Sequence, residues 1–105
     1  MPTTPTTPAI PTFHLSSAAI TDEPSFWTAL GGALEAPDGY YGRNLDALAD
    51  CLRGGYGPQA PFALVWHDAA KARKALARPL PQSGERYFDA VLDVLRSGGV
   101  TVTLR

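Results

Sequence analysis

The sequence is poor in the features that several classes of protein need. Its single cysteine, Cys51, excludes an internal disulfide framework and favours a reducing compartment, so we expect a cytoplasmic protein. No apolar run reaches the roughly 20 residues that a membrane-spanning helix requires, and no signal-peptide pattern is visible. The net charge of −1 argues against a general nucleic-acid binder, which is usually strongly basic. These absences predict a protein that contacts neither a membrane nor nucleic acid directly.

Recognisable catalytic and metal-binding patterns are also missing. The glycine-rich loop 53–58 lacks the Gly-Lys-Ser/Thr ending of a phosphate-binding loop. His14 has no Cys or His near it at metal-ligand spacing. Acid–base catalysis needs two carboxyl groups with separated pKa values in a cleft; Asp46 and Asp50 on an exposed helix show no sign of either, and no His or Lys accompanies them. We therefore expect no catalytic residue, metal or cofactor, and an enzyme that uses these two carboxylates is only a third hypothesis.

Charge and composition divide the 105 residues unevenly. Residues 1–52 carry one Arg against six Asp and Glu, a balance of −5, whereas residues 53–105 carry eight Lys and Arg against four Asp and Glu, a balance of +4. An acidic first half suits a basic protein partner. Residues 1–11 hold four Pro and four Thr and no charge, so we expect a disordered tail there and a single domain over 12–105.

Hydrophobic periodicity predicts alternating strands and helices. The expected strands are 12–15, 62–66 and 100–104. The expected helices begin near Pro24, span 44–52 and 68–78, and begin again at 83–85. The continuous apolar run 62–66 indicates a strand covered on both faces, and Trp27 lies off its helix's buried stripe, so we expect it half exposed. Helical connections favour parallel pairing, which predicts an α/β fold: a small three-stranded parallel sheet with about four helices packed around it.

Residues 40–54 are the most informative stretch. Asn44 is a typical N-cap for the helix over 44–52, because its side-chain oxygen can accept from free amides of the first turn. At about 100° per residue, three leucines fall on one side of this helix, and Asp46 and Asp50 fall together on the other. Two aromatic rings and a glycine precede the acidic pair, a mixture that suits a protein interface. A plain solvated helix face is the alternative.

The same stretch resembles the barstar family, intracellular protein inhibitors of secreted ribonucleases. The resembling runs are Tyr40-Tyr41-Gly42, Asn44 to Leu48 and Asp50 to Leu52, with Gly54 close behind. Weaker similarity at 61–66 and from Glu85 onward extends the resemblance over about 12–105. It implies the same small α/β layer. The positions that match family interface residues are Tyr40, Gly42, Asn44, Leu45, Asp46, Asp50 and Gly54, and an ungapped match adds Asp93 in place of a glutamate.

The resemblance also implies a mechanism. A ribonuclease active site holds phosphate, so it is basic, and a carboxylate on a rigid helix can take the phosphate's place through charge-assisted hydrogen bonds. Asp50 would occupy the phosphate site, and Asp46 would pair with basic groups beside it. The expected partner is a barnase-like or other microbial ribonuclease, either the cell's own or a foreign toxin, and the free chain is expected to be monomeric. An adaptor that binds a non-nuclease basic partner is the alternative.

Three departures from the family pattern bear on the choice of partner. Ala49 stands where barstar has a tryptophan, and Gly55 replaces another aromatic residue. Arg43 replaces an acidic residue and reduces the negative field at the helix start. Because large aromatic side chains are typical interface anchors, these changes imply a cognate nuclease different from barnase.

Overall fold

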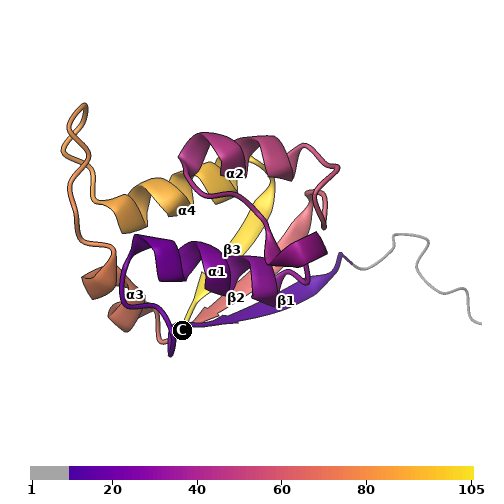
Figure 1. Cartoon of the computed structure of the whole chain (residues 1–105), viewed down its shortest axis with the longest axis horizontal. Helices are drawn as coiled ribbons and strands as arrows, with labels where there is room; N and C mark the ends of the chain where they lie inside the picture. Colours follow the sequence, from indigo (N-terminus) through magenta and orange to yellow (C-terminus); the bar gives the residue numbers. More distant parts are fainter. Residues whose placement is uncertain (1–9) are drawn as a thin grey trace, which may run out of the picture.

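A parallel three-stranded sheet in the order β1-β2-β3 organises the fold (Figure 1). The computed structural model describes residues 10–105. The strands are β1 (Thr12–Ser16), β2 (Phe62–His67) and β3 (Val100–Leu104). The described helices are α1 (Glu23–Ala33), α2 (Leu45–Leu52), α3 (Ala69–Ala75) and α4 (Tyr87–Ser97), with a short 3₁₀ turn η1 (Pro37–Gly39) before α2. The predicted fold class, a small parallel α/β sheet with helices, is therefore confirmed.

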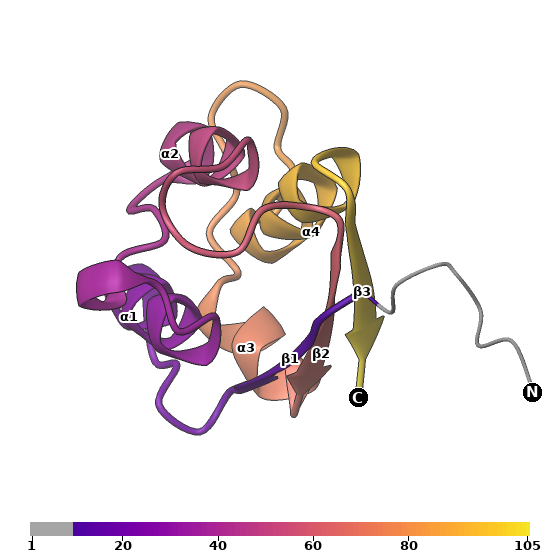
Figure 2. The same cartoon turned by 90° about the vertical axis from the view of Figure 1, so that its right-hand side faces the viewer.

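The helices cover one face of the sheet, so the expectation that β2 is covered on both faces is wrong. In Figure 2 they lie on one side of the three strands. Along β2, Phe62, Leu64 and Trp66 are completely buried, whereas the alternate residues are only partly buried. Those alternate residues include Ala63 and Val65, which are apolar although they lie on the open face. The run therefore lacks the polar alternation by which a half-covered strand is usually recognised.

Trp66 forms the centre of the core. Its ring stacks on Phe26 of α1 with a centroid distance of 5.4 Å, and it contacts Phe88 of α4 at 4.9 Å. Its indole N–H donates to the hydroxyl of Ser17 at 3.0 Å, and that hydroxyl donates to the His67 carbonyl at 2.8 Å. Each of these buried polar groups therefore has a hydrogen-bond partner, so the Trp66 ring is buried without an unsatisfied donor.

Helix α1 joins the sheet to α4. Asp22 caps it by accepting from the Ser25 amide at 2.9 Å, and the Ser25 hydroxyl accepts from the Asp22 amide at 3.0 Å, which completes a capping box. The expectation that Trp27 is half exposed is wrong, because only 6% of it is exposed. Its indole N–H donates to the Tyr87 hydroxyl at 3.2 Å. This hydrogen bond and the ring contact bury a residue that lies off the helix's main stripe.

The basic helix is shorter than the predicted 68–78. Asp68 has a left-handed backbone (φ 55°), so α3 begins one residue later, and it ends at Ala75. The chain then runs extended, with Pro79 bridged to Arg86, and α4 begins at Tyr87 and not at the predicted 83–85. Backbone hydrogen bonds between the two flanks of the connection replace the expected extra helical turns, since the amides of Tyr87 and Phe88 donate to the carbonyls of Arg78 and Leu76, both at 2.9 Å.

Three of the basic side chains in this region contact other parts of the fold. Lys71 donates to the Ala18 carbonyl at 2.6 Å. The guanidinium of Arg78 forms two hydrogen bonds with the Glu23 carboxylate, at 2.7 and 2.9 Å, and that of Arg73 lies 5.1 Å from the Phe88 ring centroid. They bind α3 and the segment after it to the body of the molecule.

The predicted tail falls almost entirely outside the described residues. Ile10 and Pro11 are the only members of the 1–11 segment within them. The amide of Ala63 donates to the Pro11 carbonyl at 2.8 Å, so hydrogen bonding to β2 begins one residue before β1. The structure therefore describes the start of the domain at β1 and not the tail itself.

The two adjacent glycines of α1 have different environments, and this generates a stability prediction. A Cβ on Gly31 would overlap the carbonyl of Gly39, whereas a Cβ on Gly32 would meet nothing within 4 Å. We expect Gly31→Ala to lower the free energy of unfolding by at least about 2 kcal/mol, because η1 must shift. Gly32→Ala should raise it by roughly 0.5–1 kcal/mol through helix propensity alone. Urea unfolding of both variants tests this pair, and effects of the same sign would contradict it.

Candidate functional site

Helix α2 is the predicted acidic helix, and its local structure agrees with the sequence. The side chain of Asn44 accepts from the Ala47 amide at 2.8 Å and therefore caps the helix as expected. Leu48 is completely buried, whereas Asp46 and Asp50 lie on the exposed side, with 67% of the Asp50 side chain accessible. The two carboxylates are thus held in solvent on a capped helix.

The Tyr41-Gly42 pair holds α2 in place. Tyr41 is completely buried, and its hydroxyl donates to the carbonyls of Cys51 and Pro58, while burial raises its pKa to about 12. Gly42 has φ 105°, and a Cβ there would lie 3.0 Å from the Leu48 amide nitrogen. Only glycine lets the chain pass this close to the helix in that conformation. The predicted site residue Gly42 is therefore buried against α2.

The remaining sequence-predicted positions of this stretch flank the helix. Leu45 is half-buried at the first helical position. Gly54 has φ 117° and donates from its amide to the Cys51 carbonyl at 3.0 Å, so it ends the helix as expected. Cys51 itself is buried, and this burial raises the pKa of its thiol, which makes the thiol less reactive.

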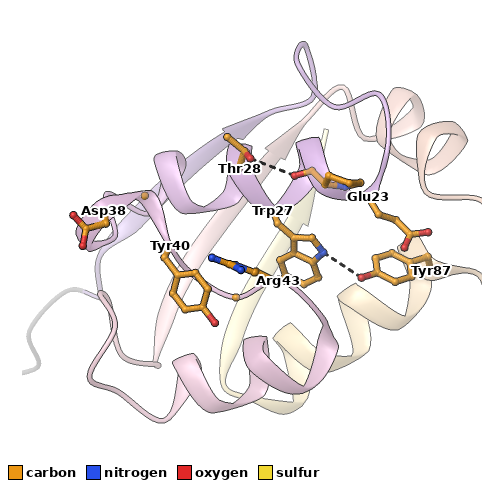
Figure 3. Close-up of a pocket in the computed structure, with 10 residues that line it drawn as sticks. Glu23, Trp27, Thr28, Asp38, Tyr40, Arg43 and Tyr87 are labelled. Carbon is orange, nitrogen blue, oxygen red and sulfur yellow. Dashed lines mark hydrogen bonds between the residues drawn. The ribbon is translucent and has the colours of Figure 1, made fainter.

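Tyr40 precedes α2 and lies on the side of that segment that faces α1. Its ring contacts Tyr56 edge to face at 6.0 Å, and the Arg43 guanidinium lies 5.7 Å from its centroid. Both Tyr40 and Arg43 line a cavity of about 550 Å³ between α1 and the chain that leads into α2 (Figure 3). Trp27 and Tyr87 form its aromatic wall, and the rim carries charges of both signs. The cavity therefore lies beside the acidic helix, and neither Asp46 nor Asp50 lines it.

The fold brings Asp93 to α2, as the family resemblance implied. Helix α4 packs against α2, and Asp93 lines a hollow that it shares with Ala49 and Arg53 of the α2 segment. Asp93 also continues an acidic row that starts at Glu85, just before α4, and includes Asp89 on the helix. A hydrogen bond to Asp93 is the main cause that raises the pKa of Glu85, and partial desolvation and the charges of both aspartates add to it. Asp93 of α4 therefore lies beside the α2 segment that carries Asp50.

Arg53 is the cation closest to the acidic pair, and sequence analysis assigned it no role. Its guanidinium lies 3.2 Å from the Asp50 carboxylate. Both side chains are largely exposed, so this ion pair adds at most about 1 kcal/mol and can reopen. Within residues 10–105 the other ion pair joins Arg78 to Glu23, which leaves Asp46 and Asp93 outside any ion pair in that range.

His14 and His67 form a pair that sequence analysis missed. Their ring nitrogens, Nδ1 and Nε2, lie 2.9 Å apart and the rings stack at 5.2 Å. Parallel pairing places Ser16 opposite His67, so His14 lies diagonally across on the open face of the sheet. His14 lies in the predicted strand 12–15, but His67 lies one residue beyond the predicted strand 62–66, and only the register of β1 and β2 brings the two rings together. Within residues 10–105 no group of three or more His, Cys, Asp or Glu is arranged to hold a metal ion.

The acidic row from Glu85 to Asp93 generates a pH prediction. The folded state binds the Glu85 proton more tightly than the unfolded state, so stability falls as pH rises above about 4.3, the ordinary pKa of glutamate. We expect Glu85→Gln to raise the urea midpoint relative to wild type at pH 7 and to leave it unchanged at pH 3. Glu35→Gln, which removes an exposed charge elsewhere, is the matched control. Equal midpoints for wild type and Glu85→Gln at pH 7 would refute the expected repulsion.

Comparison with known proteins places this geometry in a family. None of the helices in the described part of the chain is long and apolar enough to cross a membrane. A search of curated proteins returned no match. A family model described as "Barstar (barnase inhibitor)" matches residues 10–100, which run from just before β1 to the first residue of β3. Because that match spans most of the chain, this protein belongs to the barstar family.

Proposed function

We propose that the chain is an intracellular inhibitor of a ribonuclease and that α2 plugs the basic active site of that enzyme. The observation that carries the proposal is the exposure of Asp46 and Asp50 on one face of α2. Asn44 caps this helix, and its opposite face is buried in the core. The family description, a barnase inhibitor, agrees with a binding role and not with catalysis. The expected partner is a barnase-like or other microbial ribonuclease.

The charge distribution supports a cationic partner. Phosphate-binding sites use Arg and Lys, and a carboxylate can replace phosphate through charge-assisted and bidentate hydrogen bonds. Asp50 would enter the phosphate site, Asp46 would pair with basic groups beside it, and Asp93 would reach the same enzyme from α4. Because Lys71 and Arg78 are hydrogen-bonded elsewhere in the fold, they do not neutralise this face.

The rigidity of the acidic face supports tight binding. The Asn44 cap and the Tyr41 hydroxyl fix both ends of α2, so little conformational entropy remains to be lost on binding. Tyr40 and Leu45, half-buried beside the carboxylates, would supply the apolar rim of the contact, and Gly42 and Gly54 shape the backbone around it. The role assigned to each of these residues is part of the proposal.

The first test is affinity capture from the lysate and secreted fraction of the native cell. The baits are wild type and the Asp46→Ala/Asp50→Ala double variant. The proposal expects a basic protein that is held only by wild type, that cleaves RNA, and whose RNA cleavage stops when wild-type chain is added. Capture of a non-nuclease by both baits would instead favour the adaptor alternative and move the site away from α2.

With the captured nuclease in hand, Asp50→Ala should weaken binding at least roughly 30-fold, because truncating one member of a buried charge pair costs about 2–5 kcal/mol. Asp68→Asn removes the same charge at the start of α3 and suits that left-handed position, so it should leave affinity nearly unchanged. Binding kinetics and far-ultraviolet circular dichroism measure affinity and fold. Equal loss in both variants would mean that net charge, and not the Asp50 position, drives binding.

Arg53 generates a prediction of opposite sign. Removing its guanidinium releases Asp50 from the ion pair at 3.2 Å and strengthens the negative field of the helix. We expect Arg53→Gln to increase the association rate a few-fold at low salt, with a steeper salt dependence than wild type. Lys74→Gln on α3 makes the same change in net charge and should have a smaller effect. A slower association for Arg53→Gln would contradict the expected competition for Asp50.

A further inference from the structure

A hollow of about 490 Å³ opens between α2 and α4, next to the proposed carboxylate site. Ala49, one residue before Asp50, forms part of it, and Asp93 lies on its α4 side. Its size falls within the roughly 300–1,000 Å³ of ordinary binding pockets. The lining residues are Ala49, Leu52, Arg53, Asp93, Val94, Ser97 and Gly98.

Two small residues form and limit the hollow. Ala49 projects only a methyl group from α2, so the helix surface is low at this point. Gly98 lies directly against Leu52 of α2, since a Cβ there would collide with the Leu52 side chain and come within 3.1 Å of the Val94 carbonyl oxygen. The end of the hollow at Gly98 is therefore closed by the Leu52 side chain, which packs against the bare backbone of Gly98.

The lining has apolar walls and a rim without net charge. Ala49, Leu52 and Val94 supply the apolar surface, whereas Asp93 and Arg53 carry one charge of each sign. A cationic side chain entering the hollow would meet the Arg53 guanidinium, and an anionic one would meet the Asp93 carboxylate. A neutral aromatic ring would contact the apolar walls and gain from the guanidinium over its face. Its N–H or O–H could donate to the Asp93 carboxylate.

This chain offers few anchors of its own around the site. Among residues 10–105, the large apolar side chains with substantial exposure are Ile10, at 45%, and Tyr56, at 49%. Protein interfaces usually place a few aromatic anchors in fully desolvated pockets of the partner. Because the acidic face presents a hollow and not a projecting ring, the complementary projection must come from the other protein.

We propose that the hollow between α2 and α4 receives one large aromatic side chain of the nuclease, and that this contact selects which nuclease the chain binds. The inference rests on the proposed function and extends it from charge to shape. Carboxylates attract any cationic active site, whereas the hollow accepts only an enzyme with a ring at the matching position. Charge would then govern the association rate, and the inserted ring would govern the dissociation rate.

The hollow can be tested without the nuclease. N-acetyltryptophanamide is titrated into ¹⁵N-labelled wild type, with n-butylguanidinium as the cationic comparison. We expect saturable amide shifts at millimolar concentration confined to the lining residues, weaker shifts with the guanidinium, and loss of the shifts in Ala49→Trp. Ala49→Met, which also fills the hollow and favours helix, repeats the test should the tryptophan variant misfold. Shifts that persist in the filled variant, that occur elsewhere, or that are absent overturn the inference and leave ribonuclease inhibition standing.

The captured nuclease provides the second arm. Ala49→Trp should speed dissociation at least tenfold and change the association rate less than threefold, whereas Ala70→Trp, at an exposed position of α3, should change neither. Dissociation as slow as that of wild type would overturn the inference while the Asp50→Ala result still supported inhibition. The reverse pattern, in which Asp50→Ala has no effect, would refute the proposed function itself.

Discussion

The indole of Trp66 lies between Phe26 of α1 and Phe88 of α4, and this contact determines where the other helices can lie. Three parallel strands present one apolar face, and a large ring at its centre requires aromatic partners from both neighbouring helices. Its polar N–H is satisfied by Ser17, so the ring can be buried completely. With α4 placed in this way, α2 has one surface left on which to bury its leucines.

The acidic face follows from that packing. Because α2 lies against α4, the exposed Asp93 of α4 lies beside the α2 segment that carries the exposed Asp50. The pKa of Glu85 is raised chiefly by a hydrogen bond to Asp93, and the like charges of Asp93 and Asp89 add to the rise. A surface selected only for stability would place lysines or arginines among these carboxylates. Lys71, Arg73 and Arg78 instead contact other parts of the fold. Unfavourable repulsion between unpaired carboxylates is typical of a site that binds a cationic partner.

The ribonuclease proposal and the hollow separate two properties of one surface. Exposed carboxylates act over about a Debye length and attract cationic sites with little regard to shape. The hollow beside Ala49 acts only at contact, since its apolar walls gain dispersion contacts only with a side chain that fills it. Under these two proposals, members of the family would share an acidic helix and bind different enzymes according to the size of a single residue next to it.

The sequence by itself determined the features that depend on neighbours along the chain. Asn44 capped α2 as predicted, Asp46 and Asp50 were exposed, and the strand and helix order specified a parallel sheet, because capping and periodicity act within one or two turns. Only the tertiary structure decided that β2 is covered on one face, that Trp27 is buried against Tyr87, and that Gly31 needs its missing Cβ while Gly32 does not. It also brought His14 to His67 and Asp93 to the α2 segment. The family resemblance had given Asp93 as an interface position, but no local pattern in the sequence indicated its place in the fold. Each of these contacts joins residues on different elements, and their distance depends on how helices and strands pack, which local pattern does not specify.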